Sequence, residues 1–454
     1  MPNRTVTLTG WGRIAPSAAE LAHPRSAAEA AAVLQAAGRE AGGHVIPRGL
    51  GRSYNNAAQS GGGLVLSTAR LDRITSVDSR TGIAVCGAGT SLEQLMVAAL
   101  PHGWFVPVSP GTRQVTIGGA IAADVHGKNH HVGGSFARHV RELSLLLPSG
   151  EQRTVSPEAD PDLFWATAGG MGLTGLVTEA VIQLKKVETA LVKVDTVRTA
   201  DIDETMRALA EHDGRYGYTV AWSDSTATGT RLGRSVITSG DFASVDDLPA
   251  PLRLEPFAFD PRARLGAPDL FPSGLLSRHS IRLANEIWYR KGPRQRTGEI
   301  QTIGQFFHPL DGIRNWNRLY GPAGFRQYQY VLPFGREAAV RRSFEIVSAL
   351  PAPSFVTVLK RFGEASPGFL SFPRPGWTLA LDFPVRTPAL LPLLDRLDRL
   401  VLDNGGRVYL AKDSHVTRRA FEAMYPRVDD FRKLRAEIDP DGIFESDLSR
   451  RLAL

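Results

Sequence analysis

Cysteine is almost absent from this 454-residue chain, in which Cys86 is the single thiol. One thiol excludes an internal disulfide framework and a metal site built on paired cysteines. Lysine is also scarce, with 8 lysines beside 45 arginines, which indicates a GC-rich coding bias. Where arginine is the default cation, a lysine points to a need for a compact, titratable ammonium group. Lys128, Lys360 and Lys412 lie in the most motif-like segments and are candidates for that role.

Long apolar runs are missing as well. The chain has no stretch of about 18 apolar residues, so the sequence predicts no membrane-spanning helix. The N-terminus lacks the charged region and apolar stretch of a Sec-type signal peptide, and we expect any export to use another route. A net charge of +7 suits an acidic partner, such as a phosphate-bearing substrate or an anionic bilayer surface. The arginines are scattered and no basic run alternates with aromatic residues, which argues against nucleic-acid binding.

The length of the chain favours two domains, since one core rarely organises this many residues. Up to about residue 190 strand and helix patterns alternate, and Ser91 with Gln94 has the spacing of a capping box. Strands dominate beyond that point, and the polar, Pro-rich residues 247–272 are typical of a surface excursion. These patterns predict an α+β protein. The expected strands are residues 63–67, 82–88, 140–147, 327–331, 355–362, 377–383 and 407–411, and the expected helices are residues 26–40, 91–100, 336–350 and 390–404.

Three glycine-rich segments stand out, at residues 47–54, 110–120 and 163–175. Alternate glycines remove side chains and permit positive φ, so consecutive backbone N–H groups can converge on an anion such as a pyrophosphate. The first segment alone is equally typical of an ordinary turn. Together with the second segment it suggests two sides of one elongated cofactor site. Tyr54 stands where a G-x-G-x-x-G motif has its third glycine, which argues against a Rossmann-type NAD site.

Other chemistries have little support in the sequence. His126, His130 and His131 lie near Asp124, but adjacent histidines rarely point the same way and no HExxH pattern occurs, so we expect no metal. No G-x-S-x-G elbow is present, and Cys86 lies in an apolar strand. Nucleophilic catalysis is therefore not indicated.

Six short fragments, taken in order, carry a resemblance to a known family. They are residues 10–13, 49–54, 126–131, 320–325, 424–429 and 446–452. Over nearly its whole length the chain resembles the FAD-dependent oxidases of the vanillyl-alcohol oxidase fold, and among them the decaprenylphosphoryl-β-D-ribose 2′-oxidases of actinobacterial cell-wall synthesis. The resemblance implies a two-domain α+β fold in which residues 1–190 and 407–454 form the FAD-binding domain. Residues 191–406 would form an inserted substrate domain with an antiparallel sheet.

The resemblance also implies which residues hold the cofactor. The first glycine loop would bind the pyrophosphate, while the second loop and two later residues would line the flavin. The implied FAD contacts are Pro47, Arg48, Gly49, Leu50, Gly51, Arg52, Ser53, Tyr54, Asn55, Asn56, Ala57, Gly111, Thr116, Ile117, Gly118, Gly119, Ala123, Asp124, Val125, His126, Val177 and Tyr409. Arg52 stands where relatives with covalent flavin carry a histidine, so we expect noncovalent FAD. Tyr54 is expected to pack on the flavin.

Catalysis is expected at Lys412. Oxidation of a secondary alcohol needs a group that takes up the hydroxyl proton or stabilises the developing negative charge, and a lysine whose pKa falls on desolvation can do either. His126 is expected to hydrogen-bond the flavin or the substrate. The resemblance implies a substrate site made of Gln327, Gln329, Lys360, Thr378, Ala380 and Lys412.

Strand alternation places Thr378, Ala380 and Asp382 on one face, which we expect to look at the substrate. At the position of Ala380, members of the family commonly carry a cysteine that forms an adduct with nitroaromatic inhibitors activated by the reduced flavin. A methyl group cannot form that adduct.

The activity that the resemblance implies is oxidation of the ribose 2′-hydroxyl of decaprenylphosphoryl-β-D-ribose, the first half of an epimerisation to arabinose for cell-wall arabinan. A separate NADH-dependent keto-reductase would complete it. The lipid substrate implies peripheral contact with the inner membrane, on the periplasmic side by resemblance, although the lack of a visible signal peptide leaves the cytoplasmic face open. Residues 247–272 are expected to gate or contact the lipid. Two alternatives stay open, a sugar-lactone or alditol oxidase of the same fold and a flavin-binding scaffold subunit without turnover.

Overall fold

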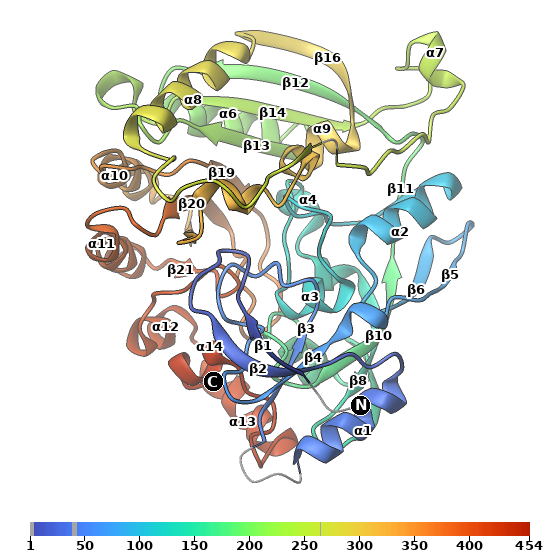
Figure 1. Ribbon diagram of the computed structural model, residues 1–454. Coiled ribbons are helices and arrows are strands. Elements are labelled where there is room, and N and C mark those ends of the chain that lie inside the picture. Colours follow the sequence, from blue (N-terminus) through green and yellow to red (C-terminus); the bar gives the residue numbers. More distant parts are fainter. Residues whose placement is uncertain (1–3, 39–42, 264) are drawn as a thin grey trace.

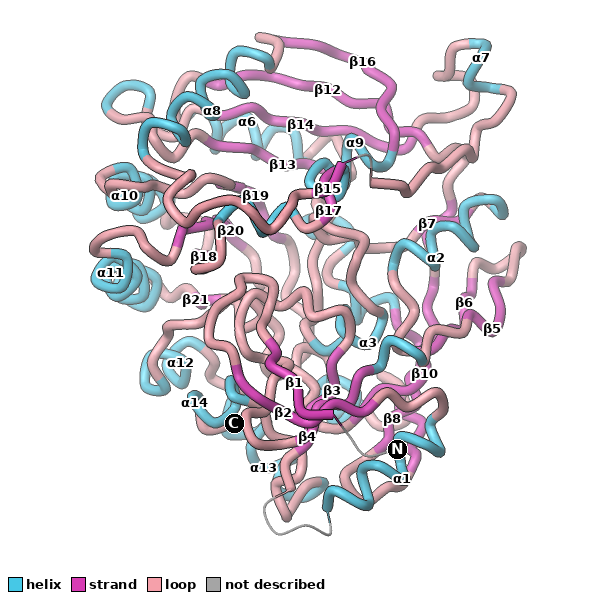
Figure 2. The backbone as a smooth tube through the Cα atoms, viewed as in Figure 1, coloured by secondary structure: helices cyan, strands magenta, loops and turns pink. Residues whose placement is uncertain are grey.

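The computed structural model describes residues 4–38, 43–263 and 265–454. The lower half of the molecule is built on two small sheets and the upper half on one large sheet (Figure 1). Loops, drawn in pink in Figure 2, make up much of the region where the two halves meet. A site assembled between the halves therefore draws on segments far apart in the sequence.

The lower half contains a four-stranded mixed sheet and a five-stranded antiparallel sheet. In sheet order the strands are β1 (Arg4–Leu8), β2 (Ser17–Ala22), β4 (Leu64–Ser67) and β3 (Val45–Arg48), then β5 (Ile74–Val77), β6 (Ile83–Gly87), β10 (Leu176–Gln183), β8 (Val140–Leu146) and β9 (Gln152–Val155). Strands β2 and β3 both run parallel to β4, so helix α1 (Ala27–Gly38) crosses over between them. Residues 39 and 40 of the helix expected here lie outside the described residues.

Two short helices of this half each begin at a residue whose side chain caps the helix. Helix α2 (Leu92–Ala99) begins at Ser91, which forms the predicted capping box with Gln94. Helix α3 (Ile117–Ala122) begins at Thr116, whose Oγ1 accepts the N–H of Gly119 at 3.2 Å, and it packs on β6 and β10. A bend at Asp124, with φ of 38°, then leads the chain to helix α4 (His130–Gly133).

The upper half is an eight-stranded sheet whose neighbouring strands are antiparallel. In sheet order the strands are β16 (Gln295–Thr302), β12 (Leu191–Thr199), β14 (Ser235–Phe242), β13 (Tyr218–Ser223), β19 (Thr357–Phe362), β20 (Gly376–Pro384), β18 (Phe325–Leu332) and β21 (Arg407–Val408). Helices α6 (Ile202–Asp213), α10 (Glu337–Ser348) and α11 (Leu390–Asp403) cover one face. The opposite face of β18, β19 and β20 looks towards the lower half. The predicted antiparallel sheet is confirmed.

After β21 the chain returns to the lower half through helices α12 (Arg418–Met424), α13 (Val428–Ile438) and α14 (Asp447–Leu452) (Figure 1). Phe444 forms an isolated parallel bridge with Val45, and the N–H of Glu445 donates to Val45 O at 2.9 Å. The last residues thus complete the core around β3. The domain bounds of residues 1–190 with 407–454, and of 191–406, stay a prediction, and residues 1–3 and 39–42 lie outside the described residues.

The strand predicted at residues 407–411 is wrong in length, because β21 ends at Val408. Tyr409 N–H still donates to Gln329 O at 2.9 Å, but the N–H groups of Lys412 and Asp413 turn back to Tyr409 O at 3.0 and 2.9 Å. Lys412 therefore lies in a tight turn beyond the edge of the sheet. The alternation of side chains along a strand therefore does not predict the direction of the Lys412 side chain.

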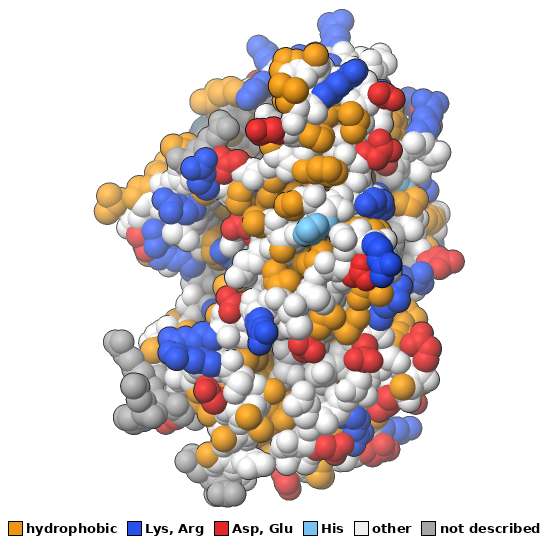
Figure 3. Space-filling view, turned by 90° about the vertical axis from the view of Figure 1, so that its right-hand side faces the viewer, with side chains coloured by type: hydrophobic (Ala, Val, Ile, Leu, Met, Phe, Trp, Pro, Cys, Tyr) orange, Lys and Arg blue, Asp and Glu red, His pale blue; other side chains and the backbone are white. Residues whose placement is uncertain are grey.

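Residues 247–272 pass over the surface but are attached at several points, and residue 264 lies outside the described part. Pro256 O accepts the N–H of Ala190 at 2.7 Å, and the Arg113 guanidinium donates to Pro261 O. The segment includes helix α7 (Ala250–Arg253). Figure 3 shows the side of the molecule that carries α2 and α7, where Lys and Arg side chains are interspersed with Asp and Glu. A role of this segment in gating stays a prediction.

Candidate active site

The first glycine loop, which follows β3, presents free backbone donors. The N–H groups of Leu50, Gly51, Arg52 and Ser53 donate to no other residue that the structure describes. The loop is fixed from beneath by Arg48, whose guanidinium donates to Ala58 O at 3.0 Å and to Thr9 O at 2.7 Å. Gly51 has φ of 65°, and a Cβ there would lie 2.4 Å from Arg48 Nη2. Four adjacent free N–H groups are the donor set that a pyrophosphate needs.

The second glycine loop lies directly beside the first. A Cβ on Gly49 would lie 2.2 Å from Thr116 Oγ1, so only glycine permits this approach. Gly111 and Gly119 are exposed, and a Cβ on Gly111 would meet no atom within 4 Å. The two loops form an open, glycine-lined trough, as the sequence suggested. Its free donors and lack of side chains fit the pyrophosphate and ring system of FAD.

Three residues expected to contact the cofactor have side chains that are buried in the core or bonded to other parts of the protein. Ile117 is completely buried and Val177 nearly so, which places both side chains in the core of the lower half. The Asp124 carboxylate accepts Ser135 Oγ at 2.8 Å and Ala137 N–H at 3.1 Å, and so holds the bend that carries residues 123–126. Burial raises the pKa of Asp124. Its side chain is engaged with protein donors.

Asn55 ties the first loop to the turn that carries Lys412. Its Nδ2 donates to Leu410 O at 2.7 Å and also to Asp413 O, while its Oδ1 accepts the N–H of Ala57 at 3.1 Å. The N–H of Tyr54 donates to Ala411 O at 3.0 Å. The position of Lys412 is therefore set by the cofactor loop, which the sequence could not indicate.

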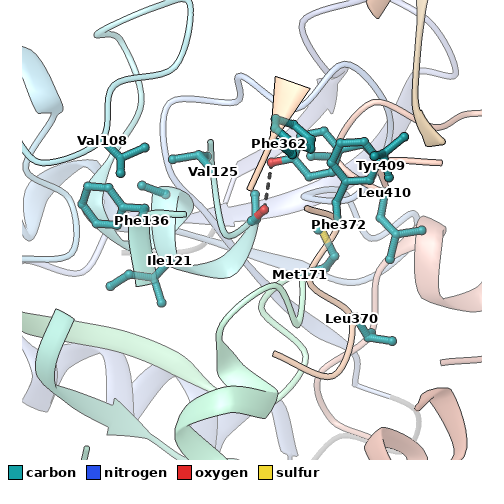
Figure 4. Packing of buried hydrophobic residues seen from close by; sticks show 14 of the residues in the cluster. Val108, Ile121, Val125, Phe136, Met171, Phe362, Leu370, Phe372, Tyr409 and Leu410 are labelled. Atoms are coloured by element: carbon teal, nitrogen blue, oxygen red, sulfur yellow. Dashed lines mark hydrogen bonds between the residues drawn. The ribbon is translucent and has the colours of Figure 1, made fainter. Parts of the chain in front are cut away.

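Aromatic side chains surround His126. Tyr409 stacks on Phe372 with ring centroids 4.7 Å apart, and its hydroxyl donates to Ala123 O at 2.8 Å (Figure 4). Phe362 and Phe372 lie 4.7 and 5.9 Å from the His126 ring. Neither phenylalanine was expected at the site, because an apolar residue carries no signal of function, whether it lies in β19 as Phe362 does or in the loop before β20 as Phe372 does. The two rings shield His126 from water.

His126 joins the lower half to the large sheet. Gln329 Nε2 lies 3.1 Å from His126 Nε2, and Lys360 Nζ lies 3.1 Å from His126 Nδ1. Burial, followed by the charges of Lys360 and Lys412, lowers the pKa of His126 well below its usual value. The imidazole is therefore neutral at physiological pH. It can orient a polar group but is a poor source of charge.

The register of the large sheet places the expected substrate residues on one face. Asp382 is paired with Gln327, Ala380 with Gln329 and Val358, and Thr378 with Lys360. Paired residues share a face, so the predicted common face of Thr378, Ala380 and Asp382 is confirmed. Gln329 Nε2 donates to Thr378 Oγ1 at 2.9 Å, whereas the buried Oε1 atoms of Gln327 and Gln329 have no partner among the described residues. These two amide oxygens are available to hydroxyl donors of a sugar.

Three of the scarce lysines lie near one another, since the charges of Lys412 and Lys128 both act on Lys360. Burial lowers the pKa of Lys128 to about 7, and burial with the charges of Lys412 and Lys128 lowers the pKa of Lys360 to about 7. Burial also lowers the pKa of Lys412 to about 8, which the charge of Asp382 opposes. A cluster of partly buried amines is poised to bind a phosphate or to exchange a proton.

Lys412 is the amine with the most freedom to react. Its Nζ lies 5.2 Å from the centre of the Tyr54 ring and donates no hydrogen bond to any other described residue. Burial raises the pKa of the nearby Asp382 to about 7, which Gln327 and the charge of Lys412 oppose. Lys412 and Asp382 are thus buried near enough to each other for each charge to act on the pKa of the other group.

Comparison with known proteins agrees with this geometry. A family model for the FAD binding domain matches residues 18–156, and one for D-arabinono-1,4-lactone oxidase matches residues 385–452. Decaprenylphosphoryl-β-D-ribose oxidase of Mycolicibacterium smegmatis is 45% identical, over 100% of this chain and 98% of that protein. The chain belongs to the decaprenylphosphoryl-β-D-ribose oxidase family. Alditol oxidase of a Streptomyces species is 25% identical over 99% of both chains.

Membership of this oxidase family settles the cofactor and the class of enzyme. The chain is an FAD-dependent oxidoreductase of the vanillyl-alcohol oxidase fold, as predicted. The glycine trough, with its free N–H groups, is where FAD fits.

Arg52 supplies no nucleophile for a covalent flavin bond. Its guanidinium lies 3.9 Å from the centre of the Trp11 ring, and its Nε donates to Gln114 O at 3.1 Å. Burial raises the pKa of Cys86 to about 12, and this thiol lies in β6 without exposed surface. Noncovalent binding of FAD stays a prediction.

Histidines and acids near the site do not converge on a metal. His130 Nδ1 accepts the N–H of Gly363 at 3.2 Å, whereas His131 Nε2 lies 2.8 Å from Tyr216 O, so the neighbouring rings point to different partners. Within residues 4–38, 43–263 and 265–454, no group of three His, Cys, Asp or Glu side chains could hold a metal ion. None of the helices in the same residues has the length and hydropathy needed to cross a bilayer.

Proposed function

We propose that this protein oxidises the ribose 2′-hydroxyl of decaprenylphosphoryl-β-D-ribose to a ketone. The observation that carries the proposal is the 45% identity over the whole chain with an oxidase named for that substrate. The site supports it chemically, since it combines amines for a phosphate, amide oxygens for hydroxyl groups and a lysine for the reacting proton.

The reaction removes two hydrogens from the alcohol, the carbon-bound one as a hydride and the hydroxyl one as a proton. The glycine trough would hold FAD, which would supply the hydride acceptor. Lys412 takes up the proton at Nζ, because a pKa of about 8 leaves part of this amine neutral near pH 8. The negative charge of Asp382 then stabilises the ammonium group that results.

The other side chains hold the sugar. Lys360 and Lys128 supply positive charge for the phosphate, and binding of the anion favours their protonated forms. Gln327 and Gln329 accept hydroxyl hydrogens with the amide oxygens that lack partners. The neutral His126 contacts both Gln329 and Lys360 and fixes the positions of these two side chains relative to each other.

The proposed product needs a second enzyme. Reduction of the ketone from the opposite side yields the arabinose epimer, and we assign this step to a separate NADH-dependent keto-reductase. A decaprenyl chain remains in a bilayer, so we infer that the oxidase acts in peripheral contact with the inner membrane. Family resemblance alone favours the periplasmic side, and the cytoplasmic face stays open. Family resemblance and the chemistry of the substrate support both assignments.

Anaerobic mixing with candidate substrates tests the proposal. Short-chain prenylphosphoryl ribose should bleach the bound flavin, whereas free alditols and sugar lactones should react much more slowly because they lack the phosphate. Faster bleaching by an alditol or a lactone would point to the sugar-oxidase alternative. The absence of bleaching by any of them would point to a scaffold subunit.

A further inference from the structure

Helix α8 (Arg278–Lys291) presents an apolar stripe to solvent. Leu283, Ile287 and Trp288 are 63%, 59% and 47% exposed, and the first two lie four positions apart on one side of the helix. Isolated exposed apolar side chains are ordinary, but a stripe along one helix marks an interaction surface. Figure 1 shows α8 at the upper left, beside the large sheet.

The inner side of the same helix is firmly attached, so the stripe is not a loose segment. Ile281 is completely buried, and Asn285 Nδ2 donates to Asp224 Oδ1 at 2.8 Å. Glu286 accepts Arg234 Nη2 at 2.5 Å. These contacts fix the orientation of the helix, so its apolar side stays exposed to water.

Positive charge surrounds the stripe. Residues 278–296 contain five arginines, one lysine and a single carboxylate, Glu286, which is already paired with Arg234 and Arg290. Arg282, Arg290 and Lys291 are exposed beside the stripe. The side shown in Figure 3 instead mixes both signs of charge. An exposed apolar stripe with a cationic border matches the interface of an anionic bilayer.

The stripe is also continuous with the substrate-facing side of the large sheet. Ala380 is paired with Val358, and Val358 is paired with Trp222 at the end of β13. These three side chains therefore share the face that carries Gln329. The Trp222 ring lies 6.0 Å from the ring of Trp288 on α8. An apolar row thus leads from the sugar-binding residues to the exposed helix.

We propose that α8 is the surface by which this protein docks on an anionic bilayer, so that the prenyl chain of its substrate reaches the active site along the row Trp288, Trp222 and Val358. The inference deepens the proposed function and rests on it for the identity of the lipid. The docking itself requires only the helix and its charges.

Sedimentation of the FAD-loaded protein with vesicles tests the docking surface. The protein should bind phosphatidylcholine vesicles that contain phosphatidylglycerol, and should bind pure phosphatidylcholine weakly. Leu283→Asp combined with Ile287→Asp should abolish sedimentation. The matched control, Val97→Asp with Leu391→Asp, changes two aliphatic residues that are each 49% exposed on α2 and α11, and should bind normally. Arg282→Gln with Lys291→Gln should weaken binding roughly thirtyfold, at about 1 kcal/mol for each basic residue.

The variants must keep their FAD and their rate with a short-chain, water-soluble prenylphosphoryl ribose, since neither Leu283 nor Ile287 belongs to the active site. Equal sedimentation of the Leu283→Asp, Ile287→Asp variant would overturn the proposal. The proposal would also be overturned if the parent protein did not bind vesicles but formed a dimer that the Leu283→Asp, Ile287→Asp variant could not form. A second copy of the chain would then cover the stripe. The vesicle assay contains no substrate, so its result is independent of the proposed reaction.

Discussion

Gln329 Nε2 lies 3.1 Å from His126 Nε2, although the two residues are 203 positions apart in the chain. The contact joins the bend after α3 to β18, the strand beside the edge strand β21 of the large sheet. Lys360 reaches the other ring nitrogen of His126 from β19, which β20 separates from β18. The neutral imidazole thereby connects the cofactor half of the molecule to the residues proposed to hold the sugar.

Asp382→Asn is expected to move the pH profile of flavin reduction. The charge of Asp382 raises the pKa of Lys412, which burial lowers to about 8, so removing that charge lowers the pKa further. The rate rises with pH as Lys412 loses its proton, and this rise should shift to lower pH in the variant. Stopped-flow measurements across pH 6–10 provide the test.

Asp398→Asn is the matched control, because Asp398 is also buried but bonds to Tyr328 on the other side of the sheet. Its profile should coincide with that of the parent protein. A profile of Asp382→Asn that is unshifted, or shifted to higher pH, would remove Asp382 from the account.

Lys360→Met should weaken binding of the phosphorylated substrate. Loss of a charge-assisted hydrogen bond costs about 1.5–3 kcal/mol, so the KM should rise roughly tenfold to a hundredfold while FAD content stays normal. Steady-state kinetics with a short-chain prenylphosphoryl ribose measure it. Lys186→Met, at an exposed lysine, serves as the control. An equal KM would show that the phosphate binds elsewhere.

Acid precipitation should release all of the FAD into the supernatant. Arg52 offers no thiol or imidazole to the flavin, and Cys86 is fully buried. The absorbance of the supernatant and the intact mass of the pellet measure the two fractions. Flavin retained by the precipitated polypeptide would contradict noncovalent binding.

Nitroaromatic inhibitors of the family should fail to modify this protein. Ala380, paired with Gln329 on the face expected to look at the substrate, has no nucleophile, and burial raises the pKa of the Cys86 thiol to about 12. Ala380→Cys should restore an adduct, detected by intact-mass spectrometry after turnover. An adduct on the unchanged sequence would show that the correspondence with the family's cysteine, or the placing of Ala380 at the substrate, is wrong.

Local patterns were sufficient to predict part of the site. Glycine spacing indicated the two loops of the trough, and strand alternation placed Ala380 and Asp382 on one face. The rarity of lysine drew attention to Lys412. Each of these signals is contained in a short stretch of sequence, where backbone geometry depends on neighbouring residues.

Long-range features could not be predicted in this way. The contacts of His126 depend on the register of strands far along the chain, and the stacking of Phe372 on Tyr409 depends on tertiary packing. Asn55 was expected at the cofactor, yet its amide holds the Lys412 turn. The lowered pKa of Lys412 results from burial, which sequence alone does not measure.

Anaerobic rapid mixing of the Lys412→Ala variant with short-chain prenylphosphoryl ribose tests the central claim most directly. The variant should keep its FAD and bind the substrate, but its flavin should be reduced about 10²–10⁴-fold more slowly, since a single acid–base group is removed. Lys433→Ala, at an exposed lysine of α13, should react at the parent rate. A Lys412→Ala rate within about threefold of the parent would contradict the proton-accepting role on which this account rests.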